Sequence, residues 1–532
     1  MTERSRTTRR SFLQGGAAMS SLLLAAHAGT GRAAGRSPID GTWKLVVGQL
    51  DNGDDLTIHY ELEQSGARLT GRAIHIAAYG YSPLSEGRIS GNRFSFSEGG
   101  YKVRGEVQGD RLLLEANYDR NWPYTNVLDP AMKKVPFGWK GTYRPFVARR
   151  MADGAGRYPA AQALPALAEL PSNGLARTPP MIWGAWYTFT TTITDELIRE
   201  MARAMVSTGM REAGYRILNM EVGWTGQRGP DGRLRANAKF PDMKALSDYL
   251  HSLGLEMGIC TSPGPYDCIG YPASYGHEEQ DARTFAEWGV DFIKHDACSV
   301  REIHSGPDAS RRVYQKMGSA LQACGRPIVY SICQYGESDV WEWGPKVGGN
   351  MWRTTDDIED TWESVSGAFE QGRLAPFAGP GHWNDPDYLM VGLGALTTEE
   401  YRTQMSLWCM LAAPLIAAPD LRSMSSETRS ILTNREIIAI DQDVRGTQGQ
   451  RVSRRGEVET WVKPLADGHA IALFNKGEKP VDAQLDTASI GLGKVREARD
   501  VWAGRDLTLE DGRHAVTLPR HGSVVLRVPQ SA

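Results

Sequence analysis

The chain has 532 residues, of which 41% are hydrophobic and 23% charged, a composition typical of a globular protein with about two to four domains. The 60 basic and 63 acidic residues leave a formal net charge of −3, which offers no bulk attraction for nucleic acid or an anionic membrane. The 6 cysteines are too few for a disulfide scaffold in a chain of this length.

Residues 1–34 have the pattern of an export signal. The segment Thr8–Leu13, which reads TRRSFL, looks like a twin-arginine signal, and Ala26-His27-Ala28 offers an Ala-x-Ala cleavage site after a small apolar stretch. That stretch is shorter than the roughly 20 residues of a membrane-spanning helix. We therefore expect a mature protein that is secreted or periplasmic through twin-arginine export, with no membrane association after signal cleavage.

Residues 38–147 are predicted to form a small antiparallel β-barrel or sandwich. Apolar and polar residues alternate over short runs at Leu56–Tyr60, Arg93–Ser97 and Val103–Val107, as in half-buried strands. Residues 148–176 carry Ala, Gly and Pro with little periodicity and predict a linker. The sequence leaves open whether the N-terminal domain binds glycan or only covers its neighbour.

Residues 177–444 alternate apolar strand-like runs with amphipathic helical runs. Eight such units in about 250 residues favour a (β/α)8 barrel. A doubly wound sheet normally has a phosphate-binding glycine turn after its first strand, and residues 183–186 (WGAW) are not one. The predicted strands are Ile182–Tyr187, Arg216–Trp224, Leu255–Thr261, Asp291–Ala297, Pro327–Tyr335, Met351–Asp357, His382–Leu389 and Met410–Ala418, and the clearest helices are Asp195–Ser207, Asp242–Leu253, Glu278–Trp288 and Ser310–Ala323.

Residues 445–532 return to short strand patterns and predict a C-terminal antiparallel β domain that packs against the barrel. The expected strands are Glu457–Val462, Ala470–Phe474, Glu497–Trp502, His514–Leu518 and Ser523–Val528. The predicted fold is therefore multidomain, with a central (β/α)8 barrel flanked by an N-terminal small β domain and this C-terminal domain.

Polar and aromatic side chains gather where the predicted barrel strands end. Catalytic groups of such barrels lie at the C-terminal ends of the strands. The segments there are 219–224, 294–298, 333–335, 352–357 and 382–387, which bring carboxylates, an arginine and a lysine to one rim. Two carboxylates with hydroxyl-binding groups suit the cleavage of a glycosidic bond, which needs a proton donor and a nucleophile or base.

Two patterns suggest a metal ion, and both are weak. Asp385 and Asp387 could bind a hard cation, and His277-Glu278-Glu279 resembles part of a zinc motif. However, His277 has no second histidine four residues later, and it stands at a predicted helix start, where Glu278 and Glu279 favour the helix dipole. We therefore expect neither a metal nor a cofactor.

At these same residues the sequence resembles family 27 of the glycoside hydrolases, the α-galactosidase and α-N-acetylgalactosaminidase group. The resemblance runs from about residue 176 to residue 530 and does not include the N-terminal β domain. The segments that carry it are 178–181 (TPPM), 276–282 (GHEEQDA), 292–296 (FIKHD), 352–358 (WRTTDDI) and 381–387 (GHWNDPD).

The resemblance implies a retaining mechanism with Asp296 as the nucleophile and Asp357 as the general acid/base. It also implies a disulfide between Cys268 and Cys298 beside the nucleophile. The alternative for the two aspartates is simple ion pairing at the barrel rim. Lys294 and Arg353 match residues that bind sugar hydroxyls, and Trp183 matches an aromatic of the sugar pocket. The candidate substrate-binding residues are Trp183, Glu221, Trp224, Lys294, Gln334, Arg353 and Asp387.

The chain departs from the family pattern at the end of the second strand. Family α-galactosidases carry an Asp-Asp pair there, which binds the 4-hydroxyl and 6-hydroxyl of galactose, whereas this chain has Glu221-Val222. Gly223 replaces the cysteine that follows the pair, and residues 187–193 lack its partner cysteine. Asp356 replaces a small residue beside Asp357. The catalytic groups are kept and the sugar contacts are changed.

The leading hypothesis is an exported retaining exo-α-glycosidase that hydrolyses terminal sugars with a non-standard preference. Its substrate is an oligosaccharide, a polysaccharide or another glycoside, and nucleic acid is not expected as a partner. Alternatives within the enzyme class are a plain α-galactosidase, an isomalto-dextranase-like α-glucan hydrolase and a β-L-arabinopyranosidase. A catalytically silent glycan-binding protein is the alternative of another class. The oligomeric state stays open.

Overall fold

The computed structural model describes residues 37–50, 55–75, 80–117, 143–152, 158–301, 303–306 and 308–529. The export-signal prediction for residues 1–34 lies outside these ranges. The chain forms two compact units. One contains the N-terminal β domain with the segments Gly264–Pro272 and Cys298–Ile303, and the other contains the central barrel with the C-terminal domain. Among the described helices, none has the length and apolar character needed to cross a bilayer.

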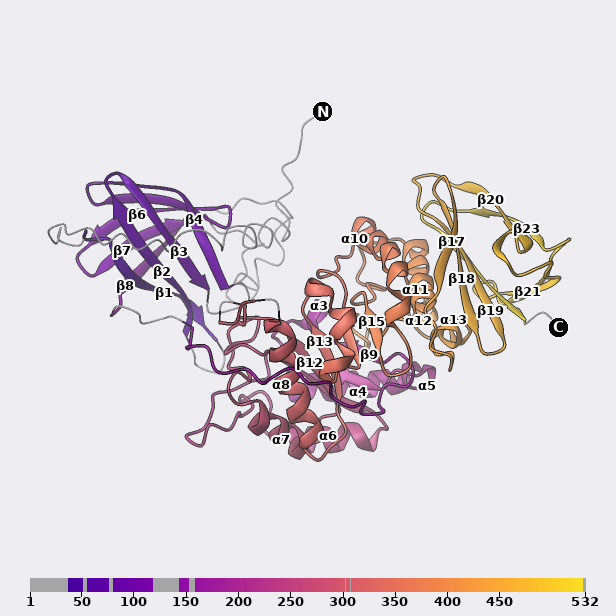
Figure 1. The fold of residues 1–532 in the computed structure, drawn as a ribbon, viewed down its shortest axis with the longest axis horizontal. Helices are drawn as coiled ribbons and strands as arrows, with labels where there is room; N and C mark the ends of the chain where they lie inside the picture. The colour runs from indigo at the N-terminus through magenta and orange to yellow at the C-terminus, as the bar shows by residue number, and fades with distance from the viewer. Residues whose placement is uncertain are drawn as a thin grey trace. The chain divides into compact units, whose positions relative to one another are not determined.

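The N-terminal domain is a closed barrel of antiparallel strands in sequence order, and it closes where β8 pairs with β1. Tyr60 on β2 and Phe96 on β5 lie 5.4 Å apart between ring centroids. These strands are not neighbours in the sheet, so the rings meet in the interior. Side chains therefore fill the barrel. Its strands, indigo in Figure 1, are β1 Gly41–Gln49, β2 Asp55–Ser65, β3 Arg68–His75, β4 Gly80–Ser90, β5 Arg93–Glu98, β6 Tyr101–Gln108, β7 Arg111–Ala116 and β8 Arg144–Arg150.

The central domain is a curled sheet of parallel strands in the order β15-β14-β13-β12-β11-β10-β9-β16. The two edge strands meet through one bridge, in which Leu389 pairs with Ala417 and Leu389 N donates to Ile416 O at 2.8 Å. Residues 386–388 separate β15 from this bridge, and we call them the seam segment. The strands are β9 Met181–Gly184, β10 Ile217–Asn219, β11 Glu256–Thr261, β12 Phe292–Asp296, β13 Val329–Cys333, β14 Met351–Arg353, β15 Trp383–Asp385 and β16 Leu415–Ala417.

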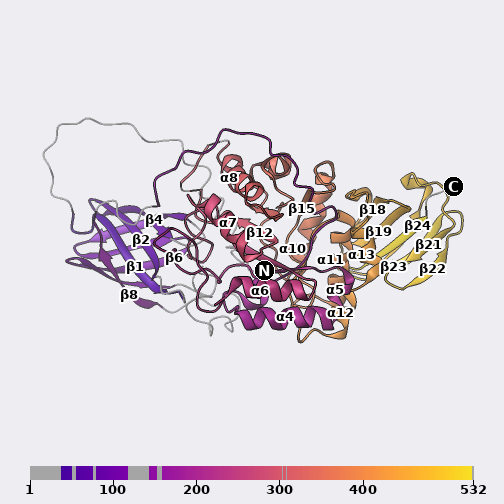
Figure 2. The same ribbon diagram turned by 90° about the horizontal axis from the view of Figure 1, so that it is seen from below.

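Helices surround this sheet, and several of them begin with a side-chain cap. The Thr194 side chain accepts from Leu197 N at the start of α4, and Thr397 and Glu400 form a capping box at the start of α11. Figure 2 shows α4 beside α6. The helices are α3 Trp186–Phe189, α4 Asp195–Ser207, α5 Met210–Ala213, α6 Met243–Ser252, α7 Glu278–Trp288, α8 Ala309–Ala323, α9 Val340–Trp343, α10 Trp362–Gly367, α11 Thr398–Leu411, α12 Ser426–Leu432 and α13 Arg435–Asp441, with 3-10 turns η2 Glu337–Asp339, η3 Pro345–Val347 and η4 Ala368–Phe377. A further 3-10 turn, η5 Ala488–Ile490, belongs to the C-terminal domain.

The eighth barrel strand is shorter than predicted. The sequence predicts a strand over Met410–Ala418, but Met410 and Leu411 form the last residues of α11, and β16 begins at Leu415. The whole run is apolar, and a uniformly apolar run contains no period that separates the end of a buried helix from a buried strand.

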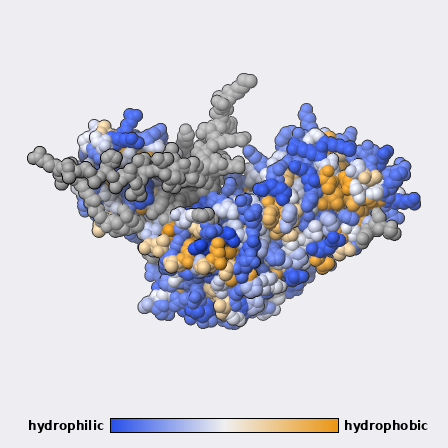
Figure 3. Space-filling model, viewed as in Figure 1, coloured by the Kyte–Doolittle hydropathy of each residue, from blue (hydrophilic) through white to orange (hydrophobic). Residues whose placement is uncertain are grey.

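The C-terminal domain has a six-stranded antiparallel sheet, β17-β18-β19-β24-β21-β22, and a two-stranded sheet, β20-β23. It packs on α11, where Trp502 Nε1 donates to Ser406 Oγ at 2.8 Å and Thr403 Oγ1 donates to His521 O at 2.7 Å. On the face shown in Figure 3, one apolar area lies over this domain and another over the central domain, with hydrophilic surface around them. The strands are β17 Gln450–Arg455, β18 Val458–Leu465, β19 Gly468–Asn475, β20 Val481–Asp486, β21 Glu497–Asp500, β22 Arg505–Thr508, β23 Arg513–Leu518 and β24 Ser523–Pro529.

Candidate active site

Strand alternation directs one set of side chains into the barrel. Phe292 lines a small cavity inside it, and Lys294, two residues later on β12, lines the same cavity. Met351 and Arg353 repeat this arrangement on β14. Because successive strand residues point to opposite faces, an apolar residue near the strand start places a polar one two positions later on the same face. The polar lining of the cavity consists of Asn219, Glu221, Lys294, Ser331, Arg353, Asp385, Asp387 and Tyr388.

Asp296 is the last residue of β12 and is held through both carboxylate oxygens. The Tyr335 hydroxyl donates to Oδ1 at 2.6 Å, and Lys294 Nζ lies 3.6 Å from Oδ2. Tyr335 lies two residues after the end of β13 and has a left-handed backbone, with φ 63°. A bulky residue in this region indicates strain, and in this conformation the phenol reaches the aspartate.

Lys294 lies between two carboxylates. Its Nζ is 3.1 Å from Glu221 Oε2 and 3.6 Å from Asp296 Oδ2. Burial alone would lower the pKa of Lys294, but the Glu221 and Asp296 carboxylates outweigh it and raise this pKa well above its usual value. The lysine is therefore a fixed positive charge between the two acids.

Glu221 is buried and makes three polar contacts. Its Oε1 accepts from Asn219 Nδ2 at 2.7 Å and from the Tyr388 hydroxyl at 2.5 Å, and its Oε2 faces Lys294. Its backbone is left-handed, with φ 60°. Val222, which follows it, is also buried and has no side-chain group that accepts a hydrogen bond.

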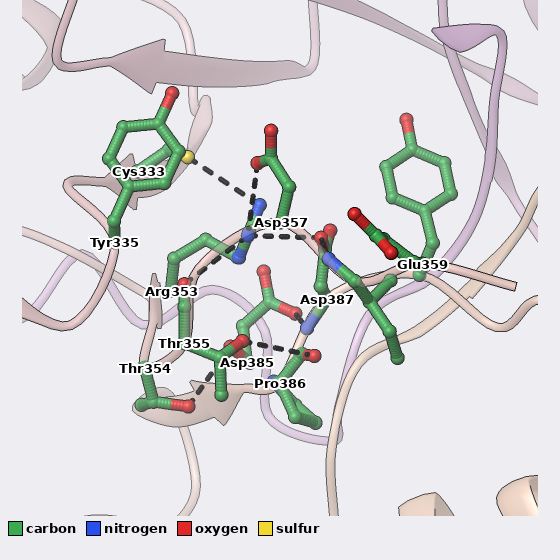
Figure 4. Close-up of polar contacts among 12 residues, drawn as sticks. Cys333, Tyr335, Arg353, Thr354, Thr355, Asp357, Glu359, Asp385, Pro386 and Asp387 are labelled. Atoms are coloured by element: carbon green, nitrogen blue, oxygen red, sulfur yellow. Dashed lines mark hydrogen bonds and ion pairs between the residues drawn. The ribbon is translucent and has the colours of Figure 1, made fainter. Parts of the chain in front are cut away.

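Arg353 joins the second pair of carboxylates. Its Nη2 lies 2.9 Å from Asp387 Oδ2 and donates to Asp357 Oδ1 at 3.3 Å, so that the guanidinium lies between the two acids (Figure 4). The Asp357 side chain is 29% exposed, against 10% for Asp296. Of the two predicted catalytic acids, Asp357 is therefore the one more open to solvent and to a leaving group.

Asp385 supports this arrangement from below. Its Oδ1 accepts from Asp387 N at 2.8 Å, which fixes the left-handed turn of Asp387, with φ 87°. Burial raises the pKa of Asp385 to about 6, although the Arg353 charge works in the opposite direction. Asp387 Oδ2 accepts from Ile358 N at 2.8 Å and also faces Arg353 Nη2, so protein groups contact one oxygen of each of these two carboxylates.

Three predicted substrate-binding residues lie apart from this cluster. Trp183 stands between Ile182 and Gly184, which face the interior, so its indole lies on the outer face, where Nε1 donates to Pro419 O at 2.9 Å. Trp224 is fully buried, and its indole lies edge-on to the rings of Phe285 and Trp288 of α7.

Gln334, the third, is also buried, and its amide donates to Glu337 O. The structure brings together the other predicted residues, namely Glu221, Lys294, Asp296, Arg353, Asp357 and Asp387. It adds Asn219, Tyr335 and Asp385, which lie in the predicted rim segments but not among the candidate substrate-binding residues, and Tyr388, which lies outside both. Counting two residues along each strand from an apolar residue that faces the interior would have selected Asn219 and Asp385. The same alternation would have placed Trp183 on the outer face.

The cysteine predictions concern two places in the fold. Cys268 and Cys298 form a disulfide, and the other four cysteines are thiols. Where the family cysteine is replaced by Gly223, a Cβ would lie 3.0 Å from Thr191 Cα. Gly223 is thus adjacent to the segment that lacks the partner cysteine. Polar contacts hold the two segments here, since Asn237 Nδ2 donates to Gly223 O and Lys239 Nζ donates to Thr191 O.

The chain matches two family models, one described as "Alpha galactosidase A" over residues 178–443 and one as "Alpha galactosidase C-terminal beta sandwich domain" over residues 455–528. It is 41% identical over 360 residues to an alpha-galactosidase of Cyamopsis tetragonoloba, covering 66% of this chain and 86% of the relative.

Two solved structures share the fold. Alpha-galactosidase I of Mortierella vinacea has a TM-score of 0.65 and 30% identity, covering 68% of this chain and 99% of its own. A GH27 β-L-arabinopyranosidase of Geobacillus stearothermophilus has a TM-score of 0.61 and 25% identity, covering 68% of this chain and 99% of its own. With these matches and the barrel-end carboxylates, the chain belongs to the α-galactosidase family of glycoside hydrolases, family 27.

Proposed function

We propose that the protein is a retaining exo-glycosidase in which Asp296 is the nucleophile and Asp357 the general acid/base. The observation that carries this is the different setting of the two acids. Asp296 is held by Tyr335 and Lys294 inside the barrel, whereas Asp357 contacts Arg353 and has the more exposed side chain. One buried, oriented carboxylate and one accessible acid suit the two roles of a retaining reaction.

In the first step, a carboxylate oxygen of Asp296 bonds to the anomeric carbon while the glycosidic C–O bond breaks. The proton of Asp357 passes to the departing oxygen, which leaves as an alcohol. In the second step, Asp357 takes a proton from water, and the resulting hydroxide attacks the anomeric carbon and releases Asp296. Lys294 and Arg353 stay charged throughout and hold the sugar hydroxyls and the acids in place.

The sugar preference that we propose rests on Glu221 and Val222, the pair at the end of the second barrel strand. Val222 supplies no acceptor, and a missing buried hydrogen bond to a hydroxyl costs about 1–3 kcal/mol, or roughly ten- to a hundredfold in specificity. Glu221 is one methylene longer than aspartate. We propose that α-galactosides are weak substrates and that β-L-arabinopyranosides, the substrate class in the name of the Geobacillus stearothermophilus relative, are better. An α-glucoside preference is the second candidate, because Val222 removes an acceptor for the axial 4-hydroxyl.

A panel of aryl glycosides tests the proposal. The mature protein is assayed with the α-D-galactoside, β-L-arabinopyranoside, α-D-glucoside and α-N-acetylgalactosaminide, with the β-D-galactoside as the control of opposite anomeric configuration. We expect the β-L-arabinopyranoside to be hydrolysed faster than the α-D-galactoside, and we expect no turnover of the control. NMR of the first-formed sugar should show retained configuration. Binding of a glycan without turnover of any substrate would instead favour the glycan-binding alternative.

We further propose that the protein is exported by the twin-arginine route, on the basis of the segment Thr8–Leu13. The full chain is expressed in a twin-arginine-competent host, next to a variant with Arg9→Lys and Arg10→Lys. The native chain should appear outside the cytoplasm with its first residues removed, and the variant should stay inside. Equal export of both chains would reject this route.

A further inference from the structure

The hydroxyl of Tyr388, in the seam segment, donates a hydrogen bond to Glu221, which lines the pocket. It is only 2% exposed, and its hydroxyl lies 2.5 Å from Glu221 Oε1. Asn219 Nδ2 donates to the same oxygen at 2.7 Å. A carboxylate oxygen has about two lone-pair sites, so these two donors occupy Oε1. A sugar hydroxyl can then reach Glu221 only through Oε2, the oxygen that also faces Lys294.

The Tyr388 ring also fills space inside the pocket wall. A Cβ built on Gly184 would lie 2.1 Å from the Tyr388 hydroxyl oxygen and 2.6 Å from Cε1 and Cζ. The ring therefore takes the volume that a side chain at position 184 would occupy. Tyr187 packs edge-on against the ring, with centroids 5.0 Å apart. The contacts with Gly184, Glu221 and Tyr187 therefore fix the position of the phenol ring.

We propose that Tyr388 is a specificity-determining residue that narrows the sugar subsite to a pentopyranose. By holding Oε1 of Glu221 and filling the volume over Gly184, it removes both the acceptor and the room that an exocyclic hydroxymethyl group needs. This inference rests on the proposed function, because it concerns the sugar bound between Asp296 and Asp357.

The test is a ratio of two activities, kcat/KM for an aryl β-L-arabinopyranoside over that for the matching α-D-galactoside. Tyr388→Ala opens the volume and frees Oε1, so the ratio should fall about tenfold or more. Tyr388→Phe frees Oε1 but keeps the ring, so its ratio should lie between those of the native protein and the alanine variant. Tyr401→Phe is the matched control, because that hydroxyl bonds Gly394 N and Asp360, outside the pocket, and its ratio should not move.

A coupling experiment separates the volume effect from a general loss of activity. Gly184→Ala should lower both activities in the native background, because its Cβ overlaps the ring. In the Tyr388→Ala background the same change should cost at least about fivefold less, since the overlapping atoms are gone. Circular dichroism and thermal unfolding establish that each variant is folded.

The outcomes distinguish the two levels of the argument. If the native protein hydrolyses the substrates but folded Tyr388→Ala leaves the ratio unchanged, the inference is overturned and the proposed function stands. Additive effects of Gly184→Ala and Tyr388→Ala would also overturn the role of the ring. If the native protein hydrolyses neither substrate, the proposed function fails and the inference falls with it.

Discussion

The hydroxyl of Tyr335 donates a hydrogen bond of 2.6 Å to Oδ1 of Asp296, across the neighbouring strands β13 and β12. Lys294 faces the other oxygen, Oδ2, at the longer distance of 3.6 Å. The tyrosine contact thus orients the carboxylate. In the mechanism that we propose, Tyr335 is a positioning residue for Asp296, and Oδ2 is the oxygen that faces the sugar.

Tyr335→Phe should lower kcat by roughly ten- to a hundredfold with little change in KM, because it releases the orientation of Asp296 without removing a sugar contact. Tyr330→Phe is the matched control. Its hydroxyl bonds His295 Nδ1 at 2.9 Å, next to Asp296 in sequence, and its loss should leave kcat close to that of the native protein. Equal losses in the two variants would show that Tyr335 has only a structural role.

Asp296→Asn should lower turnover on the order of 10³-fold or more, because an amide cannot form the glycosyl ester. A 2-fluoro glycoside inhibitor followed by peptide mass spectrometry should label Asp296 in the native protein and leave the variant unlabelled. Label on another carboxylate, or substantial activity of the folded variant, would contradict the assignment.

Asp357→Ala should separate substrates by their leaving groups. A dinitrophenyl glycoside leaves without protonation, so its first step should be nearly unaffected. An alkyl glycoside needs the proton and should slow by about 10²–10⁴-fold. Asp356→Ala serves as the neighbouring control and should treat both substrates alike. A loss of the same size on both substrates with Asp357→Ala would argue that another residue supplies the proton.

Asp441, at the end of α13, should make stability depend on pH. Within the described part of the chain its Oδ1 has no hydrogen-bond partner. Burial raises its pKa to about 7, with the Lys463 charge and the Gln442 amide opposing. The folded state keeps this proton up to about pH 7 and the unfolded state loses it near pH 4, so the stabilisation present at low pH disappears as pH rises through 7.

Asp441→Asn should remove this dependence. Between pH 5 and pH 8 the free energy of unfolding of the native protein should fall relative to that of the variant, on the order of 1–4 kcal/mol. Thermal unfolding of both proteins across this range measures the difference. Parallel curves would mean that Asp441 does not titrate there. Activity at 25 °C should be unchanged, since Asp441 lies outside the pocket.

Local patterns predicted the elements well where they are amphipathic. The predicted helices Asp195–Ser207 and Glu278–Trp288 coincide with α4 and α7, since each has one apolar face and acidic residues in its first turn. The Met410–Ala418 run failed because it is apolar throughout. The (β/α)8 barrel and both flanking β domains follow from the change of period along the chain.

The pocket was harder to predict than the fold. Acids at strand ends are visible in the sequence. Asp357 and Asp387 do meet on Arg353, and Asp296 lies beside Lys294. The contact between Tyr388 and Glu221 joins residues 167 positions apart, so no local periodicity of the sequence predicts it. The tryptophans misled because aromatic rings suit sugars, whereas Trp183 and Trp224 are used here to pack the barrel against surrounding segments.

The seam segment has a consequence for how such a pocket changes over evolution. Residues 386–388 lie outside the strand ladder, between the end of β15 and the bridge of Leu389 to Ala417. Strand pairing therefore places little demand on their identity, while Asp387 and Tyr388 contact Arg353 and Glu221. A substitution at position 388 can change the sugar that fits without weakening any hydrogen bond of the sheet. The closure point of the barrel is thus a place where the pocket can vary while the strand pairing stays intact.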